Sequence, residues 1–201
     1  MNKATDIKAY IQWLDMLMSD FSSFAKYLAD EESDFWDEFH SSKIESTKYD
    51  DLSLYCGMSR GVFVSDNCDY AIKFALNKRG EEDCEKEVAN YQAAVKEGIQ
   101  EMFASVEFGF VYRGKKFYIC ERADADEDYA MERAASYSGK DINDISGSDE
   151  EAVDDIFYSY YDYCLVNRFL DFCSEMGIND IHMANIGFDG DTVKCIDYAG
   201  Y

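Results

Sequence analysis

The sequence predicts an α+β protein in which helices precede and follow an antiparallel sheet, and three observations lead to this fold class. Apolar residues recur every three or four positions over residues 6–29, which is the period of one buried helix face. Short apolar runs separated by Gly, Asn and Asp dominate residues 52–120, as in strands joined by hairpins. Helical periodicity then returns over residues 148–176.

The composition favours a folded chain. Its 201 residues suffice for one domain with a sizeable core or for two small lobes, and a hydrophobic content of 47% is too high for disorder. No run of 18 apolar residues and no basic-then-apolar leader occur, so we expect a cytoplasmic protein that does not bind membranes. Seven cysteines without a C-x-x-C pair fit reduced thiols, and two histidines exclude a His-rich metal centre.

The formal net charge of −23 narrows the possible partners. A surface this acidic repels phosphate backbones, which excludes nucleic acid and anionic membranes as direct partners. It permits docking on the basic surfaces of other proteins. Simple solubility is an equally good reason for the charge.

The first fifty residues form an N-terminal helical extension in this interpretation. We expect one amphipathic helix over residues 6–29 and a shorter acidic helix that contains Phe35, Trp36 and Phe39. Both are expected to pack on the domain behind them, and a partner-binding arm is the alternative.

Five strands are predicted next, the first two separated by a loop of small residues at 57–61. Such a loop lets backbone N–H groups approach phosphates closely, although a two-glycine loop is more often only a hairpin turn. A turn is also expected at Arg113 and Gly114. The strands are predicted at residues 52–56, 62–64, 70–76, 102–110 and 116–120.

Lys73 lies within the third predicted strand, between apolar neighbours. Because lysine is seldom buried without a partner, we expect an acidic residue on the following helix, residues 81–97. Glu87 is the preferred partner. A register error of one turn would move the role to one of its neighbours, Glu82, Asp83 or Glu85.

Residues 124–150 are acidic and irregular, with four carboxylates just after the last strand (Asp124, Asp126, Glu127 and Asp128). A run of like charge is usually a solvated face, and collecting a basic substrate is the alternative. A short helix is predicted over residues 129–137. Ser148 and Glu151 then form a capping box that opens one long helix to Met176.

The last part of the chain presents three polar residues on one predicted hairpin. Asp180 precedes Asn185 by five positions, an Asp-Gly-Asp turn follows residues 186–188, and the returning strand ends at Asp197. A carboxylate near an attacking hydroxyl and oxygen ligands for Mg2+ are what phosphoryl transfer needs. In a chain with 42 acidic residues, the same set can also arise by chance. His182 is interpreted as a structural hydrogen-bonding residue.

These parts resemble the protein kinase superfamily. Asp180 and Asn185 have the spacing of its catalytic loop, Asp197 falls where its Asp-Phe-Gly motif would lie, and the setting of Lys73 resembles Val-Ala-Ile-Lys. The form D-I-H-M-A-N is similar to that of small kinase-like proteins of bacteria and bacteriophages, including early serine/threonine kinases of some podophages, and of aminoglycoside phosphotransferases. Two departures are that Ile178-Asn179 replaces His-Arg and that Ala199 replaces the last Gly, with Gly200 one place late.

The resemblance implies a kinase-like amino-terminal lobe over residues 51–122, with a five-stranded antiparallel sheet and one helix. It implies a truncated, mostly helical carboxy-terminal lobe over residues 123–201 that ends after the catalytic hairpin. ATP and Mg2+ are the implied cofactors. Asp180, Lys73 and Glu87 would be catalytic, and Asn185 and Asp197 would hold the metal. The implied nucleotide-binding residues are Gly57, Ser59, Arg60, Gly61, Lys73, Glu121 and Ala123.

Two functions of different classes follow. The first is phosphorylation of Ser, Thr or Tyr on a protein, in the host cytoplasm if the chain is viral. The second is a kinase-fold acidic protein that inhibits a basic or nucleic-acid-binding partner by imitating nucleic acid, and the charge together with the expected absence of an activation segment after Asp197 favours it. A small-molecule phosphotransferase shares the motifs but usually carries a larger helical lobe.

Overall fold

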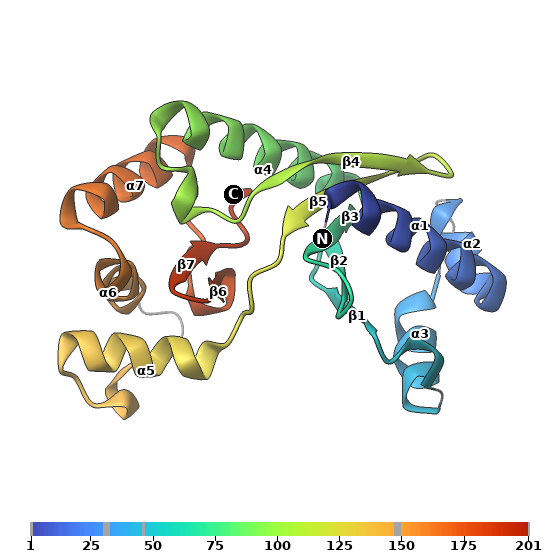
Figure 1. Ribbon diagram of the computed structural model, residues 1–201, viewed down its shortest axis with the longest axis horizontal. Coiled ribbons are helices and arrows are strands. Elements are labelled where there is room, and N and C mark those ends of the chain that lie inside the picture. The colour runs from blue at the N-terminus through green and yellow to red at the C-terminus, as the bar shows by residue number, and fades with distance from the viewer. Residues whose placement is uncertain (1, 30–32, 46, 147–149, 201) are drawn as a thin grey trace. The chain divides into compact units, whose positions relative to one another are not determined.

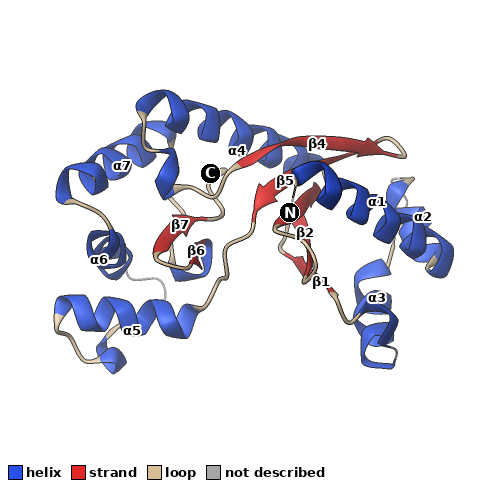
Figure 2. Cartoon of the chain, in the orientation of Figure 1, coloured by secondary structure: helices blue, strands red, loops and turns tan. Residues whose placement is uncertain are grey.

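The computed structural model describes residues 2–29, 33–45, 47–146 and 150–200, and its elements are drawn in Figures 1 and 2. The described residues form seven α-helices, a five-stranded antiparallel sheet and a two-stranded hairpin, which confirms the α+β class. The chain divides into two compact units. The first comprises Met1–Cys84 and Val106–Glu121, and the second comprises Glu85–Ser105 and Arg122–Tyr201.

The sheet belongs to the first unit and confirms the predicted five antiparallel strands. Its order, β1-β2-β3-β5-β4, makes β3 the central strand. β1, β2 and β3 pair in sequence order. β5 then pairs with β3, and β4 pairs with β5 at the edge of the sheet. The strands are β1 (Leu52–Cys56), β2 (Arg60–Ser65), β3 (Tyr70–Ala75), β4 (Val106–Tyr112) and β5 (Lys115–Glu121).

The fourth strand begins later than predicted. Residues 100–102 form a 3-10 turn, η2 (Gln100–Met102), and β4 starts only at Val106. Phe103 and Ala104 are apolar and buried outside the sheet, and Ala104 N–H bonds to Cys195 O at 2.9 Å. The turn that ends β4 is where the sequence predicted it, with positive φ at Arg113 (47°) and Gly114 (88°).

Three helices lie over one face of this sheet: α1 (Lys3–Asp20), α2 (Ser22–Leu28) and α3 (Phe35–Glu45). The single helix predicted over residues 6–29 is wrong, because Phe21 adopts an extended backbone (φ −122°, ψ 109°) that separates α1 from α2. Phe21 is itself buried. The apolar period therefore continues through the break. Periodicity alone cannot reveal that a single residue with extended backbone divides the helix.

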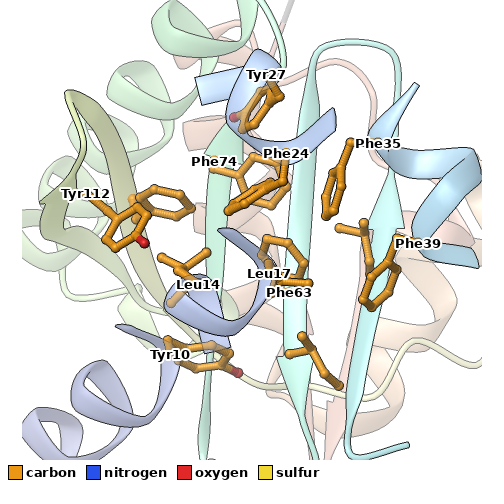
Figure 3. Close-up of a cluster of buried hydrophobic side chains, with 14 of the residues drawn as sticks. Tyr10, Leu14, Leu17, Phe24, Tyr27, Phe35, Phe39, Phe63, Phe74 and Tyr112 are labelled. Atoms are coloured by element: carbon orange, nitrogen blue, oxygen red, sulfur yellow. The ribbon is translucent and has the colours of Figure 1, made fainter. Parts of the chain in front are cut away.

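An aromatic core joins these helices to the sheet, and we call α1–α3 the helical cap. Phe74 of β3 stacks on Trp36 with ring centroids 5.7 Å apart, and Phe39 meets Phe63 edge-on at 6.4 Å. Figure 3 shows the helical side chains lying against the strands. The expectation that the first fifty residues pack on the domain is confirmed for their described part, because the apolar faces of these helices are used within the first unit.

Helix α4 (Lys78–Glu97) begins in the first unit and continues into the second, where α5 (Glu127–Ser138), α6 (Glu150–Tyr160) and α7 (Tyr163–Met176) follow. The prediction of one helix up to Met176 is wrong. The Asp162 side chain accepts hydrogen bonds from the N–H groups of Cys164 (3.0 Å) and Leu165 (3.1 Å), so it caps a new helix. Ser148 of the predicted capping box lies outside the described residues.

Aromatic side chains also form the core of the second unit. Phe103 contacts the rings of Phe169, Phe172 and Tyr198 at centroid distances of 4.9 to 5.7 Å, and Phe157 packs on Phe169 at 4.6 Å. Through Phe103, these contacts join Tyr198 near the end of the chain to α7. Within the described parts of the chain, no helix combines the length and the apolar character needed to cross a membrane.

Candidate functional site

The predicted terminal hairpin is present in the second unit as β6 (Ile186–Asp189) and β7 (Thr192–Cys195). Ile186 pairs with Cys195 and Asp189 with Thr192, and Gly190 has the positive φ (58°) that the tight turn requires. The inward-facing residues of both strands are buried, which anchors the hairpin in the core and leaves its polar ends outside it (Ile186, Phe188, Val193 and Cys195 are inward).

Two of the three predicted polar residues are joined at the start of this hairpin. Asn185 Nδ2 donates a hydrogen bond to the backbone carbonyl of Asp180 at 2.7 Å and lies 3.0 Å from His182 Nε2. In the described part of the chain, Oδ1 of Asn185 accepts no hydrogen bond. The Asp180 carboxylate lies 3.7 Å from His182 Nε2 and is 43% exposed. His182 therefore supports the loop, and the Asp180 carboxylate is accessible.

Asp197 lies two residues after the end of the returning strand, β7. Ile196 N–H bonds to Asn185 O at 2.8 Å, so the backbone pairing continues one step beyond β7 and brings Asp197 to the end of the hairpin at which Asn185 lies. Burial, and then the nearby Cys173, Asp197 and Glu87, raise the pKa of the Cys195 thiol well above its usual value. Glu87 and Asp197 thus both lie close to Cys195.

Residues that the sequence did not single out hold this end of the chain. Asn90 of α4, which is buried, donates from Nδ2 to Tyr198 O at 2.7 Å, and the Tyr198 hydroxyl donates to Ala104 O. Tyr161 donates to Val193 O at 2.7 Å. Asp197 is consequently followed by a firmly anchored residue. Asn90 shares the buried face of α4 with Cys84, Glu87 and Ala94, so its place in the helical period was the available sequence signal.

Among the acidic residues of α4, burial distinguishes Glu87. Its side chain is fully buried (0% exposed), whereas Glu82 and Glu85 are exposed. Asp83 is engaged elsewhere, because it accepts a hydrogen bond from Ser59 Oγ at 2.8 Å. Among these residues, Glu87 is therefore the best candidate for the buried acidic residue that the sequence predicted on this helix.

Lys73 lies in the middle of the central strand, opposite Val62 on one side and Tyr118 on the other. It is only 9% exposed. Its neighbours Ile72 and Phe74 belong to the aromatic core under the helical cap. Because side chains alternate along a strand, Lys73 is on the opposite face of the sheet. A lysine held in this way is the unusual feature that the sequence predicted.

The small-residue loop is shorter than predicted. Arg60 and Gly61 are part of β2, where a Cβ on Gly61 would lie 2.4 Å from the ring of Phe74, so packing alone accounts for that glycine. Leu76 N–H bonds to Ser59 O at 2.8 Å, and Gly57 N–H to Arg60 O at 2.9 Å. The loop is therefore closed by the bond between Gly57 and Arg60 and is tied to the residue after β3 through the Ser59 carbonyl.

The predicted hinge residues continue from β5. Glu121 is the last residue of that strand and pairs with Tyr70. After Arg122, Ala123 packs on β6, since a Cβ on Gly187 would lie 2.8 Å from the Cβ of Ala123. Asp124 and Phe188 then exchange two backbone hydrogen bonds of 2.9 Å.

In the acidic segment that follows, Asp126 has a structural role. Asp126 caps α5 by accepting a hydrogen bond from Tyr129 N–H at 2.9 Å. Asp124 is 79% exposed and lies 3.6 Å from Arg122 Nε. Since Glu127 and Asp128 are exposed in the first turn of α5, most of this charge faces solvent.

Asn185 and Asp197 carry oxygen atoms of the types that bind magnesium. Mg2+ takes few protein ligands, typically one or two carboxylates together with substrate phosphates and water. Asn185 Oδ1 and the Asp197 carboxylate are oxygen donors of this kind. The described residues contain no cluster of three or more His, Cys, Asp or Glu side chains that could hold a metal ion by themselves.

The predicted site residues are therefore distributed over both units. Asp180, Asn185, Asp197 and Glu87 belong to the second unit, and Lys73 belongs to the first, as does the small-residue loop. The ion pair between Lys73 and Glu87 stays a prediction. In comparisons with known proteins, no family model matched this chain and no curated protein matched it.

Proposed function

We propose that this chain is a kinase-like phosphotransferase that uses ATP and Mg2+ to phosphorylate a Ser, Thr or Tyr hydroxyl of a protein with a basic surface. The observation that carries the proposal is the hydrogen bond from the Asn185 side-chain amide to the Asp180 carbonyl. This bond fixes the five-residue loop, so that an accessible carboxylate and an amide oxygen are held at one end of the hairpin.

Each residue has a defined role in the proposed reaction. The substrate hydroxyl oxygen attacks the γ-phosphorus of ATP and the bond to the β-phosphate oxygen breaks, which releases ADP. Asp180 accepts the hydroxyl proton. Asn185 and Asp197 supply oxygen ligands to Mg2+, which neutralises charge on the phosphates when bound. Lys73, supported by Glu87, holds the α- and β-phosphates.

The burial of Lys73 and Glu87 supports these roles. Both are charged side chains removed from water, with exposures of 9% and 0%. Burying an ionisable group is costly unless it is paired or used, and buried ionisable groups are frequent in functional sites. The nucleotide-binding roles proposed for Gly57, Ser59, Arg60, Gly61, Glu121 and Ala123 depend on this assignment.

The net charge of −23 favours a second candidate function. In it, the chain is an acidic binding protein that occupies the basic or nucleic-acid-binding surface of another protein without catalysis. A pure binder has no need of Lys73, Asp180, Asn185 and Asp197 together, which is why phosphoryl transfer is preferred.

Transfer of label from radioactive ATP to proteins of a bacterial lysate tests the proposal. We expect labelling with the wild-type chain and its loss in the Asp180→Ala and Asp197→Ala variants. Asp189→Ala is the matched control, since Asp189 is an exposed carboxylate at the turn of the same hairpin, and it should label normally. Labelling that persists in both site variants would show that the site is assigned wrongly. Capture of a basic protein without any labelling would favour the second candidate.

A further inference from the structure

Buried polar groups of the helical cap are concentrated on β3, the strand that carries Lys73. The aromatic core already holds the cap against the sheet, so hydrogen bonds are not needed to cover that face. Three polar side chains of α1 and α2 are nevertheless buried against the strands: Asp6 at 1% exposure, Tyr10 at 0% and Tyr27 at 7%. Each one bonds to the backbone of β3 or to the turn that leads into it. A fourth, Ser23, bonds to Glu38 within the cap.

Asp6 and Tyr10 hold the beginning of the strand. The Tyr10 hydroxyl donates to Tyr70 O at 2.8 Å and accepts from Ser65 N–H at 3.0 Å, which joins the end of β2 to the start of β3. Asp6 Oδ2 accepts from the N–H groups of Asp69 (2.8 Å) and Tyr70 (3.1 Å). Burial raises the pKa of Tyr10, so its hydroxyl keeps its proton and remains a donor.

Tyr27 holds the other end. Its hydroxyl donates to Ala75 O, the last residue of β3, at 2.6 Å, and its ring lies against Phe74 with centroids 5.9 Å apart. Figure 3 shows Tyr10 and Tyr27 at opposite ends of the buried cluster. Lys73 lies between the two bonded carbonyls, on the opposite face of the sheet.

We propose that Asp6, Tyr10 and Tyr27 are positioning residues that hold β3, the strand of Lys73, from the face of the sheet opposite the lysine side chain. They touch the backbone on either side of Lys73 and act on its ammonium group only through the strand. A side chain on a strand held at both ends has a narrower range of positions, which lowers the cost of placing its charge against a phosphate. The inference rests on the nucleotide-binding role proposed for Lys73.

The test compares Tyr27→Phe and Tyr10→Phe with a matched control, Tyr112→Phe. The Tyr112 hydroxyl donates to Asp15 Oδ1 of α1 at 2.8 Å, so the control removes the same chemical group and the same kind of contact with the cap, but on β4. Amide hydrogen exchange is measured on peptides that cover β3 and β4. Michaelis constants for ATP are measured in parallel.

In Tyr27→Phe we expect exchange in β3 to rise by about fivefold relative to β4, the factor that the loss of one ordinary hydrogen bond predicts. Tyr10→Phe removes two hydrogen bonds, to Tyr70 O and from Ser65 N–H, and should raise β3 exchange at least as much. We expect KM for ATP to rise by a similar factor at nearly constant kcat. Tyr112→Phe should leave β3 exchange and KM unchanged.

Equal increases in amide exchange in β3 and β4, or a control that matches the test variants, would overturn the proposal. The helical cap would then cover the sheet without positioning β3 specifically. Selective exchange in β3 with a KM for ATP unchanged would also overturn the proposal. If these variants show selective exchange in β3 and the wild-type chain does not bind ATP, the result would support the positioning of β3 by Tyr10 and Tyr27 and contradict the proposed function.

Discussion

The side-chain amide of Asn185 donates to the backbone carbonyl of Asp180 at 2.7 Å, across a loop of five residues. The same amide nitrogen lies 3.0 Å from His182 Nε2, and the backbone carbonyl of Asn185 accepts from Ile196 N–H at 2.8 Å. Asn185 therefore links the loop that carries Asp180 to the strand that leads to Asp197. One residue thereby connects the backbone around Asp180 to the backbone that leads to Asp197.

Asn185→Ala should lower the rate of phosphoryl transfer by about a hundredfold, because a loop displaced by about 1 Å loses the geometry that transfer needs. The free energy of unfolding should fall by only about 1 kcal/mol, the value of one hydrogen bond. Steady-state kinetics and urea unfolding measure the two effects. Asn179→Ala, at an exposed residue next to Asp180, is the control and should change neither. A variant with normal kinetics would exclude Asn185 from the site.

Glu87→Ala should destabilise the protein by about 3 kcal/mol, because it removes a fully buried polar side chain and leaves its partners unsatisfied. Glu85→Ala, two residues away and exposed, should stay within about 0.5 kcal/mol of the wild type. Urea unfolding of both variants provides the comparison. Equal effects would mean that burial does not set Glu87 apart from its neighbours on α4.

Gly80→Ala should destabilise the first unit although alanine is the better helix former. A Cβ at this residue of α4 would lie 1.9 Å from Ser59 O, and relieving that overlap costs about 2 kcal/mol, more than the gain of up to about 1 kcal/mol in helix propensity. Gly57→Ala is the control, because its nearest neighbour is 3.7 Å away. Thermal unfolding should rank Gly80→Ala well below Gly57→Ala, and the reverse order would disprove the contact.

Asp154 on α6 should make stability depend on pH. Burial, and then the carboxylates of Asp155, Glu150 and Glu151, raise its pKa to about 6 from the ordinary 3.8. Since the folded state holds this proton more tightly than the unfolded chain, the contribution is favourable near pH 4 and is lost as the pH rises to about 6.

Asp154→Asn should therefore raise the melting temperature at pH 7, by an amount that corresponds to about 1 kcal/mol once solvent screening of this half-buried group is allowed for, and should change little at pH 4. Glu150→Gln, at an exposed residue of the same helix, is the matched control and should have a smaller effect at either pH. A gain from Asp154→Asn of equal size at both pH values would contradict this account.

The sheet and the terminal hairpin could be predicted because their signals are local. Alternating apolar residues and turn residues such as Gly114 and Gly190 specify strands and the reversals between them within a few residues. The link between Asp180 and Asn185 is also local, since five residues of loop suffice to bring the amide to the carbonyl.

The helix breaks and the anchors of the site could not be predicted in the same way. The apolar period runs unchanged through Phe21, and it also continues past Asp162 in the tyrosine-rich run, where that residue caps a new helix. The bond from Asn90 to Tyr198 joins residues 108 positions apart, and the close approach of Gly80 to Ser59 depends on how a helix meets a loop. Such contacts are set by tertiary packing, which leaves no periodic trace in the sequence.

The most direct measurement is the shift in melting temperature caused by ATP with Mg2+, compared for the wild type, Lys73→Ala and Asp197→Ala. The account predicts that the wild type gains stability, by about 2.7 kcal/mol at a hundredfold excess of nucleotide over Kd, and that both variants lose most of that gain. No shift in the wild type, or the same shift in all three proteins, would contradict the claim that Lys73 and the terminal hairpin bind one nucleotide.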